Sequence, residues 1–239
     1  MRPIFALILV LLTSLVTPGH AEPPRPPPVL TISSNNSPLV RQALRLLSEE
    51  AFRRTGLELR LVSMPSARSL QAANAGEVDG EGLRIGGLDK QYPDLIQIPE
   101  RYVGDTYVAF ARDASIRLDQ GWASLEPYRI SYITGWKVFE ANATRARSIT
   151  PVETAEQMFR MLDAGRIDLA LYTLVDGEAL IRSLGLSSLG AARPVLKEVD
   201  MYLYLHRRHA DLVPQIARAL RDMKADGSYN RIVHSLSAP

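Results

Sequence analysis

The sequence carries few residue types that could support covalent or metal chemistry. It has no cysteine and only four histidines in 239 residues, which excludes thiol nucleophiles, disulfides and cysteine-based metal sites and disfavours a zinc site. His206 and His209 are close in sequence, but no third metal ligand accompanies them. The chain therefore favours recognition of a small molecule over catalysis by a thiol or a metal, and we expect no cofactor.

Two arginines are candidates for contact with a ligand. Arg68 lies near the start of a predicted helix, and Arg84 lies at or just beyond the end of a predicted strand. Ligands of open α/β sheets gather at the carboxyl ends of strands. Because a guanidinium group matches a carboxylate bidentately, both arginines are predicted to bind an anionic group of the ligand. The alternative is a structural salt bridge with Glu77, Asp79 or Glu81.

Further candidates for the ligand site are aromatic or polar side chains next to predicted strand ends. Aromatic rings could stack on a flat ligand, although packing in the core is the competing role. Glu81 could accept a hydrogen bond from a ligand amine or act as a base. The serine and asparagine after the first strand could donate hydrogen bonds, or form a solvated turn. The side chains in this second group are Ser34, Asn35, Glu81, Tyr107, Trp136 and Tyr172.

Length and charge limit the function classes further. The chain has 28 Lys and Arg against 26 Asp and Glu, a formal net charge of +2, and no run of basic residues. Neutralising a nucleic-acid backbone requires a concentrated positive charge, so nucleic acid is not expected as a partner. The length suits one or two domains.

The N-terminus has the pattern of a secretory signal peptide. Arg2 precedes an apolar run from 4 to 16, and small residues at Gly19 and Ala21 mark a cleavage site after Ala21. Residues 1–21 are therefore predicted to be removed, which places the protein in the periplasm. Residues 22–28 are rich in proline and are predicted to form a stiff linker.

The chain that follows alternates strand and helix patterns. Residues 29–33, 57–62 and those after 78 are predicted strands, separated by helices that begin at Ser37 and Ser66. This order predicts a mainly parallel sheet covered by helices. A later region repeats the helix and strand, with a capping box at 150–153 and a strand at 167–172.

Two copies of one short motif indicate two related lobes. Ala-Gly-x-x-Asp occurs at 75–79 and at 164–168, each time where a helix ends and a strand begins. A structural role is favoured for Asp79 and Asp168, in fixing the turn through backbone N–H groups. Strand-like stretches near Val108 and Met201 are predicted to cross between the lobes. Lobe 1 would comprise 29–108 and 202–239, and lobe 2 would comprise 109–201, with a hinge and an interlobe cleft.

These residues resemble the periplasmic solute-binding proteins of polar amino-acid ABC transporters, family 3. The resemblance is carried by 65–80, by 155–171 and by the segment 220–232. It implies the two-lobed, α/β periplasmic binding protein-like II fold. Segment 86–91 lacks the arginine with which the family holds an α-carboxylate, and Thr173 stands where the family has an acidic residue for the α-ammonium group. The family's Gly-Thr loop is replaced by 135–137, Gly-Trp-Lys.

The resemblance implies a non-enzymatic, monomeric receptor that closes its cleft on a small polar, carboxylate-bearing, amino acid-like ligand. Thr173 joins the predicted ligand-binding residues on this basis. An ABC permease of the inner membrane would be the partner, or a sensory receptor or kinase in an alternative reading. A second alternative is a periplasmic dehydratase of the prephenate or arogenate type, with Glu81 as the group that moves the proton.

Overall fold

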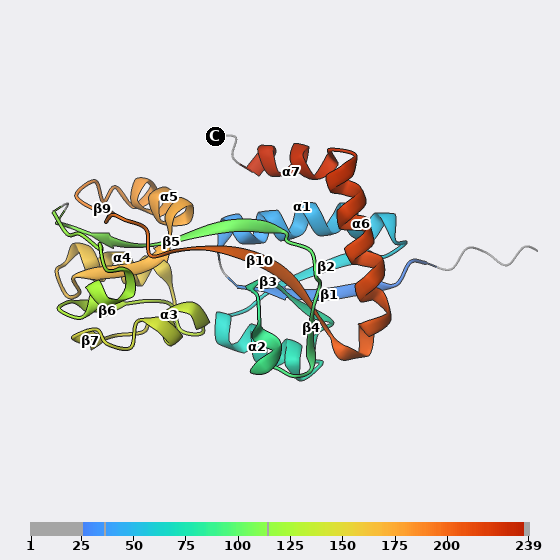
Figure 1. Cartoon of the computed structure of the whole chain (residues 1–239), viewed down its shortest axis with the longest axis horizontal. Helices are drawn as coiled ribbons and strands as arrows, with labels where there is room; N and C mark the ends of the chain where they lie inside the picture. Colours follow the sequence, from blue (N-terminus) through green and yellow to red (C-terminus); the bar gives the residue numbers. More distant parts are fainter. Residues whose placement is uncertain (1–25, 36, 114, 237–239) are drawn as a thin grey trace, which may run out of the picture.

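The computed structural model describes residues 26–35, 37–113 and 115–236; the predicted signal peptide and its cleavage site lie outside these residues. Its strands form one continuous sheet in the order β2-β1-β3-β10-β5-β8-β6-β7, with β4 and β9 attached to β10 and β5. Figure 1 shows that β5 and β10 are the two long strands that run from one half of the molecule to the other. The two predicted crossings are therefore present.

Lobe 1 is built on a parallel set of strands, with β1 between β2 and β3, and β10 returns antiparallel to β3. Helices α1, α6 and α7 lie on one side of this sheet in Figure 1, and α2 lies on the other. The elements are β1 (Val29–Ser34), α1 (Pro38–Arg54), β2 (Glu58–Ser63), α2 (Ser66–Asn74), β3 (Gly80–Ile85), β4 (Leu95–Gln97), β10 (Lys197–His206), α6 (Val213–Ala225) and α7 (Ser228–Leu236), with 3-10 helices at Leu88–Lys90 and Arg207–Leu212.

Lobe 2 repeats the parallel arrangement, with β6 between β7 and β8, and β5 antiparallel to β8. Its elements are β5 (Val103–Ala111), β6 (Arg129–Ser131), α3 (Lys137–Asn142), β7 (Ser148–Ile149), α4 (Ala155–Asp163), β8 (Leu169–Thr173), α5 (Leu174–Leu184) and β9 (Gly190–Ala191), with a 3-10 helix at Gly121–Leu125. Helices α4 and α5 pack on β8, so the strand end at Thr173 leads directly into α5.

The predicted helix starts have mixed outcomes. Ser37 is the N-cap of α1, where its side chain accepts a hydrogen bond from the N–H of Val40, as predicted. The predicted cap at Ser66 is wrong, because Pro65 is the N-cap of α2 and no side chain caps it. The capping box at 150–153 is also wrong, because α4 begins after Thr154, whose hydroxyl accepts from the N–H of Gln157.

The buried apolar residues gather in separate clusters along the chain. One cluster draws its residues from Tyr107 to Leu196, and the other two draw theirs from the segments before Tyr107 and after Leu196. Ile85 and Val199 are partly buried against more than one cluster. The exact lobe limits at 108 and 202 stay a prediction. Within the described residues, no helix is long and apolar enough to cross a membrane.

Candidate functional site

A buried ion pair lies on β3 beside the start of α2. The Nη2 atom of Arg84 is 2.5 Å from Oε1 of Glu81, and Nε donates to the same oxygen at 2.6 Å. Nη1 and Nη2 donate to the hydroxyl and the carbonyl of Ser66 at 2.6 and 2.8 Å. The guanidinium of Arg84 is thus directed at this ion pair and at the first turn of α2.

Glu81 is fully buried, and its second carboxylate oxygen also has partners. Oε2 accepts hydrogen bonds from the hydroxyls of Ser33 on β1 and Ser69 on α2. Through these hydrogen bonds the carboxylate of Glu81, on β3, connects β1 and α2. Of the alternatives that the sequence left open for Arg84, the structure shows the salt bridge with Glu81. Arg68 lies elsewhere, exposed on α2.

The two lobes touch at a carboxylate of α5. Asp176 accepts from the hydroxyl of Ser37 at 2.5 Å and from the N–H of Leu39 at 3.1 Å, both at the start of α1. The hydroxyl of Thr173 also donates to it, at 3.3 Å. A carboxylate at a helix N-terminus interacts favourably with the exposed N–H groups and with the helix dipole. This carboxylate holds α5 of lobe 2 against α1 of lobe 1.

A second contact between the lobes depends on a glycine. Gly135 has a φ of +84°, and a Cβ atom there would lie 2.4 Å from the backbone nitrogen of Ala67. The hydroxyl of Ser66 donates to the carbonyl of Gly135 at 3.4 Å. Only a residue without a side chain permits this close approach of the loop before α3 to α2.

Two cavities lie between these contacts, and both have walls from both lobes. We call the larger one the outer cavity; it has a volume of about 410 Å³. Its residues are Ser37, Pro38, Ser66, Ile133, Trp136, Glu153, Thr154, Ala155, Glu156, Tyr172, Asp176, Ala179, Leu180 and Ser183. The inner cavity, of about 20 Å³, shares Trp136 with the outer cavity. Its other residues include Asn35, Arg84, Asp105, Tyr107 and Lys137.

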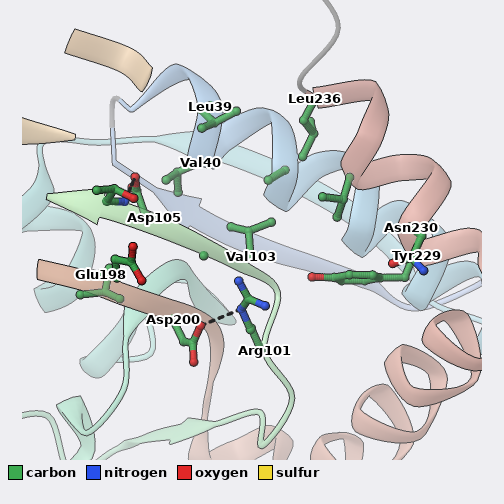
Figure 2. Close-up of a pocket in the computed structure, with 15 residues that line it drawn as sticks. Leu39, Val40, Arg101, Val103, Asp105, Glu198, Asp200, Tyr229, Asn230 and Leu236 are labelled. Carbon is green, nitrogen blue, oxygen red and sulfur yellow. Dashed lines mark hydrogen bonds and ion pairs between the residues drawn. The ribbon is translucent and has the colours of Figure 1, made fainter. Parts of the chain in front are cut away.

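A larger cavity lies outside this interlobe region, among the residues that the structure describes. This hinge groove, of about 720 Å³, runs along β5 and β10 beneath α1 and α7. Figure 2 shows its aliphatic wall of Leu39, Val40 and Leu236 above the hinge strands, with Arg101 paired to Asp200 below. We regard the interlobe cavities as the better candidate site despite the smaller volume, since residues of both lobes converge there.

Asp105 lies where the inner cavity and the hinge groove meet. Its side chain lines both, and its carboxylate accepts only the N–H of Thr106, at 2.8 Å, among the contacts of the described residues. Burial and then the charge of Asp176 raise the pKa of Asp105 to about 7, against the opposing hydrogen bond from Thr106. The charge of Asp176 is therefore close enough to act on Asp105.

The three predicted aromatic residues are brought together. Trp136 stacks on Tyr172 with ring centroids 5.0 Å apart, and its ring centroid is 6.1 Å from that of Tyr107. All three are buried in the core of lobe 2, and each lines an interlobe cavity. They therefore contribute to the core and to the candidate site together. Burial raises the pKa of Tyr172 above its ordinary value, and so do the nearby charges of Asp176 and Asp105.

The remaining predicted residues are buried near the start of α1 or α5. Asn35 lines the inner cavity and accepts from the N–H of Ser37 at 3.1 Å. Ser34 is buried, and its hydroxyl has no hydrogen-bond partner among the described residues. Thr173 is buried behind Asp176. As ligand contacts, all nine residues remain predictions.

Sequence reasoning missed Asp176 and Asp105. A signal for Asp176 was present, because it comes three residues after Thr173, in the region where the resemblance expects an acidic side chain. In a helix that begins at Leu174, this spacing returns the side chain to the same end of the strand. The sequence contains no signal for Asp105. Side chains alternate between the two faces of β5, but this alternation does not show which face of a hinge strand is buried.

Comparisons with known proteins give a fold. No protein-family model matches the chain. An uncharacterised protein of Shewanella oneidensis is 25% identical over 198 residues, which cover 78% of this chain and 72% of that protein.

Solved structures match over most of the chain. A histidine kinase sensor domain with similarity to periplasmic binding proteins has a TM-score of 0.73 at 16% identity, covering 87% of this chain and 95% of that one. A mutant of ArgBP from T. maritima has a TM-score of 0.74 at 17% identity, covering 88% and 96%. The amino acid ABC transporter substrate-binding protein AbpA from Streptococcus pneumoniae, bound to L-arginine, has a TM-score of 0.71 at 11% identity, covering 87% and 94%. The predicted fold class is thereby confirmed: the chain has the two-lobed α/β fold of the periplasmic binding proteins.

Proposed function

We propose that this protein is a periplasmic solute-binding protein that closes its lobes on one small polar molecule and delivers it to an ABC transporter. The observation that supports this most is the outer cavity, whose walls come from α1 and α2 of lobe 1 and from α4 and α5 of lobe 2. Its volume of about 410 Å³ lies in the range of small-molecule sites. The solved neighbours named for a transporter or for arginine share this fold.

The mechanism follows from where the contacts lie. A ligand in the outer cavity touches both lobes only when the lobes are closed, so it binds the closed state more tightly than the open state. Binding then shifts the population toward the closed state. Asp176 and Gly135 set the closed geometry, since their contacts join residues of α1 and α2 to lobe 2.

The periplasmic location is part of the same proposal. It depends on the predicted cleavage after Ala21, which would release a chain that begins at Glu22. We propose a monomer that docks on an inner-membrane permease and binds no nucleic acid, in keeping with the near-zero net charge of +2.

Sensing is the second candidate function. The resemblance to a histidine kinase sensor domain, with a TM-score of 0.73, favours it. In that case the closed lobes would dock on a receptor or kinase in place of a permease. The dehydratase alternative has less support, because Glu81 is fully buried, holds Arg84, and lines neither interlobe cavity.

Two glycine variants test whether ligand binding requires closure. Gly135→Ala adds a Cβ that would lie 2.4 Å from the backbone of Ala67, so we expect it to hold the lobes apart. Gly185→Ala is the matched control, since it also has a positive φ, +67°, but its Cβ would meet nothing within 4 Å. Both variants share the backbone cost of a positive φ.

The measurement is a thermal-shift screen of amino acids, amines and organic acids, followed by small-angle scattering with any compound that binds. At about 100 times its dissociation constant, a ligand should add about 2.7 kcal/mol of stability. Gly135→Ala should lose at least tenfold in affinity and show no contraction on binding, while Gly185→Ala should match the parent. Equal affinity and equal contraction in all three proteins would contradict closure on the ligand.

A further inference from the structure

The charged side chains that line the outer cavity are all acidic. Asp176, Glu153 and Glu156 contribute to its walls, and no lysine, arginine or histidine does. Glu156 is paired with Arg160 at the surface, 2.9 Å away. Among the described residues, Asp176 and Glu153 have no basic side chain within ion-pair distance. The cavity therefore has an uncompensated negative charge.

Of these three carboxylates, Asp176 should interact most strongly with a ligand cation, because only 7% of the residue is exposed. Its three hydrogen bonds all come from neutral donors, namely two hydroxyls and the N–H of Leu39. A buried carboxylate without a cation is costly, and a cation that arrives beside it removes part of this cost.

The basic groups near the cleft are already occupied. Arg84 is bonded to Glu81 and Ser66, and the ammonium of Lys137 is 2.8 Å from Glu140. Arg68 is exposed and lines neither interlobe cavity. A ligand carboxylate would have to separate Arg84 from Glu81 and leave a fully buried carboxylate without its partner.

The remaining walls suit an apolar body next to a positive charge. Trp136 and Tyr172 stack on each other and both line the outer cavity, beside Ile133 and Leu180. Trp136 also stacks on Phe139, with ring centroids 5.8 Å apart, so the buried rings supply an apolar wall to the cavity. The acidic groups suit the positive charge of such a ligand, and the apolar wall suits its body.

We propose that the outer cavity binds an organic cation, an amine or guanidinium compound with an apolar or aromatic body and no carboxylate, with its positive group beside Asp176. This rests on the proposed function, because it assigns a ligand class to the same interlobe site. It differs from the carboxylate-bearing ligand that the sequence led us to expect.

Titration calorimetry with matched compounds tests this ligand class. One series is tyramine, tyrosine and 4-hydroxyphenylacetate, which share the phenol and carry an amine, an amine with a carboxylate, and a carboxylate alone. The other is agmatine and arginine, which differ only in the carboxylate. We expect tyramine or agmatine to bind at least tenfold more tightly than tyrosine or arginine, and 4-hydroxyphenylacetate to show no binding. If the carboxylate-bearing member binds as tightly as the amine or more tightly, the ligand class is overturned and the solute-binding function stands.

Two variants of α5 locate the charge. Asp176→Asn keeps an oxygen that can accept from Leu39 and should lower amine affinity at least tenfold, while its melting temperature confirms folding. Glu178→Gln removes the same charge from an exposed position of the same helix and should leave the affinity unchanged. Equal amine affinity in Asp176→Asn and the parent would overturn the assignment to Asp176. If no compound in either series binds a folded protein, the ligand class is overturned, and the broader thermal-shift screen decides whether the solute-binding function stands.

Discussion

The two lobes place an aspartate at the same junction and use it in the same way. Oδ2 of Asp79 accepts the N–H of Thr31 at 2.8 Å, and Oδ2 of Asp168 accepts the N–H of Arg129 at 2.8 Å. In each lobe this bond joins the loop before the last parallel strand to the strand beside it. Each aspartate also pairs with an arginine at 2.6 Å, Arg208 in lobe 1 and Arg129 in lobe 2.

The origin of the arginine is what separates the lobes. Arg129 is in β6, within the continuous stretch of lobe 2, and it also donates to the carbonyl of Gly165 at 3.0 Å. Arg208 follows β10, in the returning chain, and donates to the carbonyl of Gly76 at 2.5 Å. In lobe 2 the arginine that pairs with the aspartate therefore comes from the same continuous stretch of chain. In lobe 1 it comes from a segment that follows both crossings between the lobes.

The lobes diverge on the side that faces the cleft. Two and five residues after Asp79 come Glu81 and Arg84, which form the buried ion pair. The residues two and five positions after Asp168 are Ala170 and Thr173. Ala170 lies in the apolar core, and Thr173 donates a hydrogen bond to Asp176. The repeated motif thus fixes the strand, while the positions that follow it give each lobe its own chemistry. Three predictions test this comparison.

The largest effect is expected at the ion pair that only lobe 1 possesses. Glu81→Ala would leave the guanidinium of Arg84 buried without its carboxylate, so we expect a loss of about 3–5 kcal/mol in the free energy of unfolding. Urea unfolding of the purified chain measures it. Replacing both groups, as Glu81→Gln with Arg84→Met, should cost less than Glu81→Ala alone. A Glu81→Ala protein as stable as the parent would show that the pair is not a structural element of lobe 1.

An intermediate effect is expected at the shared aspartates, and it should be unequal. Asp79→Ala removes bonds to Thr31, Arg208 and His209, so we expect a loss of about 2–3 kcal/mol. Asp168→Ala removes bonds to Arg129 alone. The side chain of Asp168 is also more exposed than that of Asp79, 28% against 17%. We therefore expect a smaller loss, of about 1–2 kcal/mol. Urea unfolding of the two variants side by side gives the difference.

The pH dependence of these two losses provides the control. Burial raises the pKa of Asp79, but its bonds to Thr31, Arg208 and His209 outweigh this and lower it below the ordinary value. The hydrogen bond from Arg129 lowers that of Asp168. An aspartate whose pKa is lower in the folded state stabilises the fold at pH values above its ordinary pKa. This stabilisation is lost as the pH falls through the pKa of the folded state. Both differences from the parent should therefore shrink below about pH 4; losses that stay constant at low pH would contradict an ionic role.

The smallest effect is expected at the hinge, outside the repeat of the two lobes. Burial and Asp176 raise the pKa of Asp105 to about 7, so the folded state carries the cost of its charge above pH 7. Asp105→Asn should be at least about 1 kcal/mol more stable than the parent at pH 8. This gain should decline as pH falls from 7 towards 4, because the parent then binds the proton. The charged groups around Asp105 are Arg84, Arg101, Lys137, Asp176, Glu198 and Asp200.

Unfolding of both proteins across pH 5–8 measures the effect at Asp105. Thr106→Val is a useful companion, since it changes the neighbouring side chain and leaves the N–H that donates to Asp105. It should not alter the pH profile. A stability gain for Asp105→Asn that is the same at pH 5 and pH 8 would show that the carboxylate is not the titrating group.

Helix and strand order could be predicted because it depends on local patterns. The apolar spacing after Ser37 and the cap itself are confirmed in α1. The start of α4 was wrong, because Val152 pairs with Ile133 across a β-bridge and keeps the chain extended until Thr154 takes the cap. Tertiary pairing outweighed the local capping signal there.

The sequence by itself determined the two lobes, the two crossings and the repeated aspartates, because these follow from periodicity and from residues close to one another along the chain. The tertiary structure decided the chemistry of the cleft. Arg84 could have faced a ligand, but burial beside Glu81 made the ion pair its partner. Asp176 contacts Leu39 across 137 residues of sequence. Which charges meet in a cavity depends on how distant segments pack, and no local pattern contains that information.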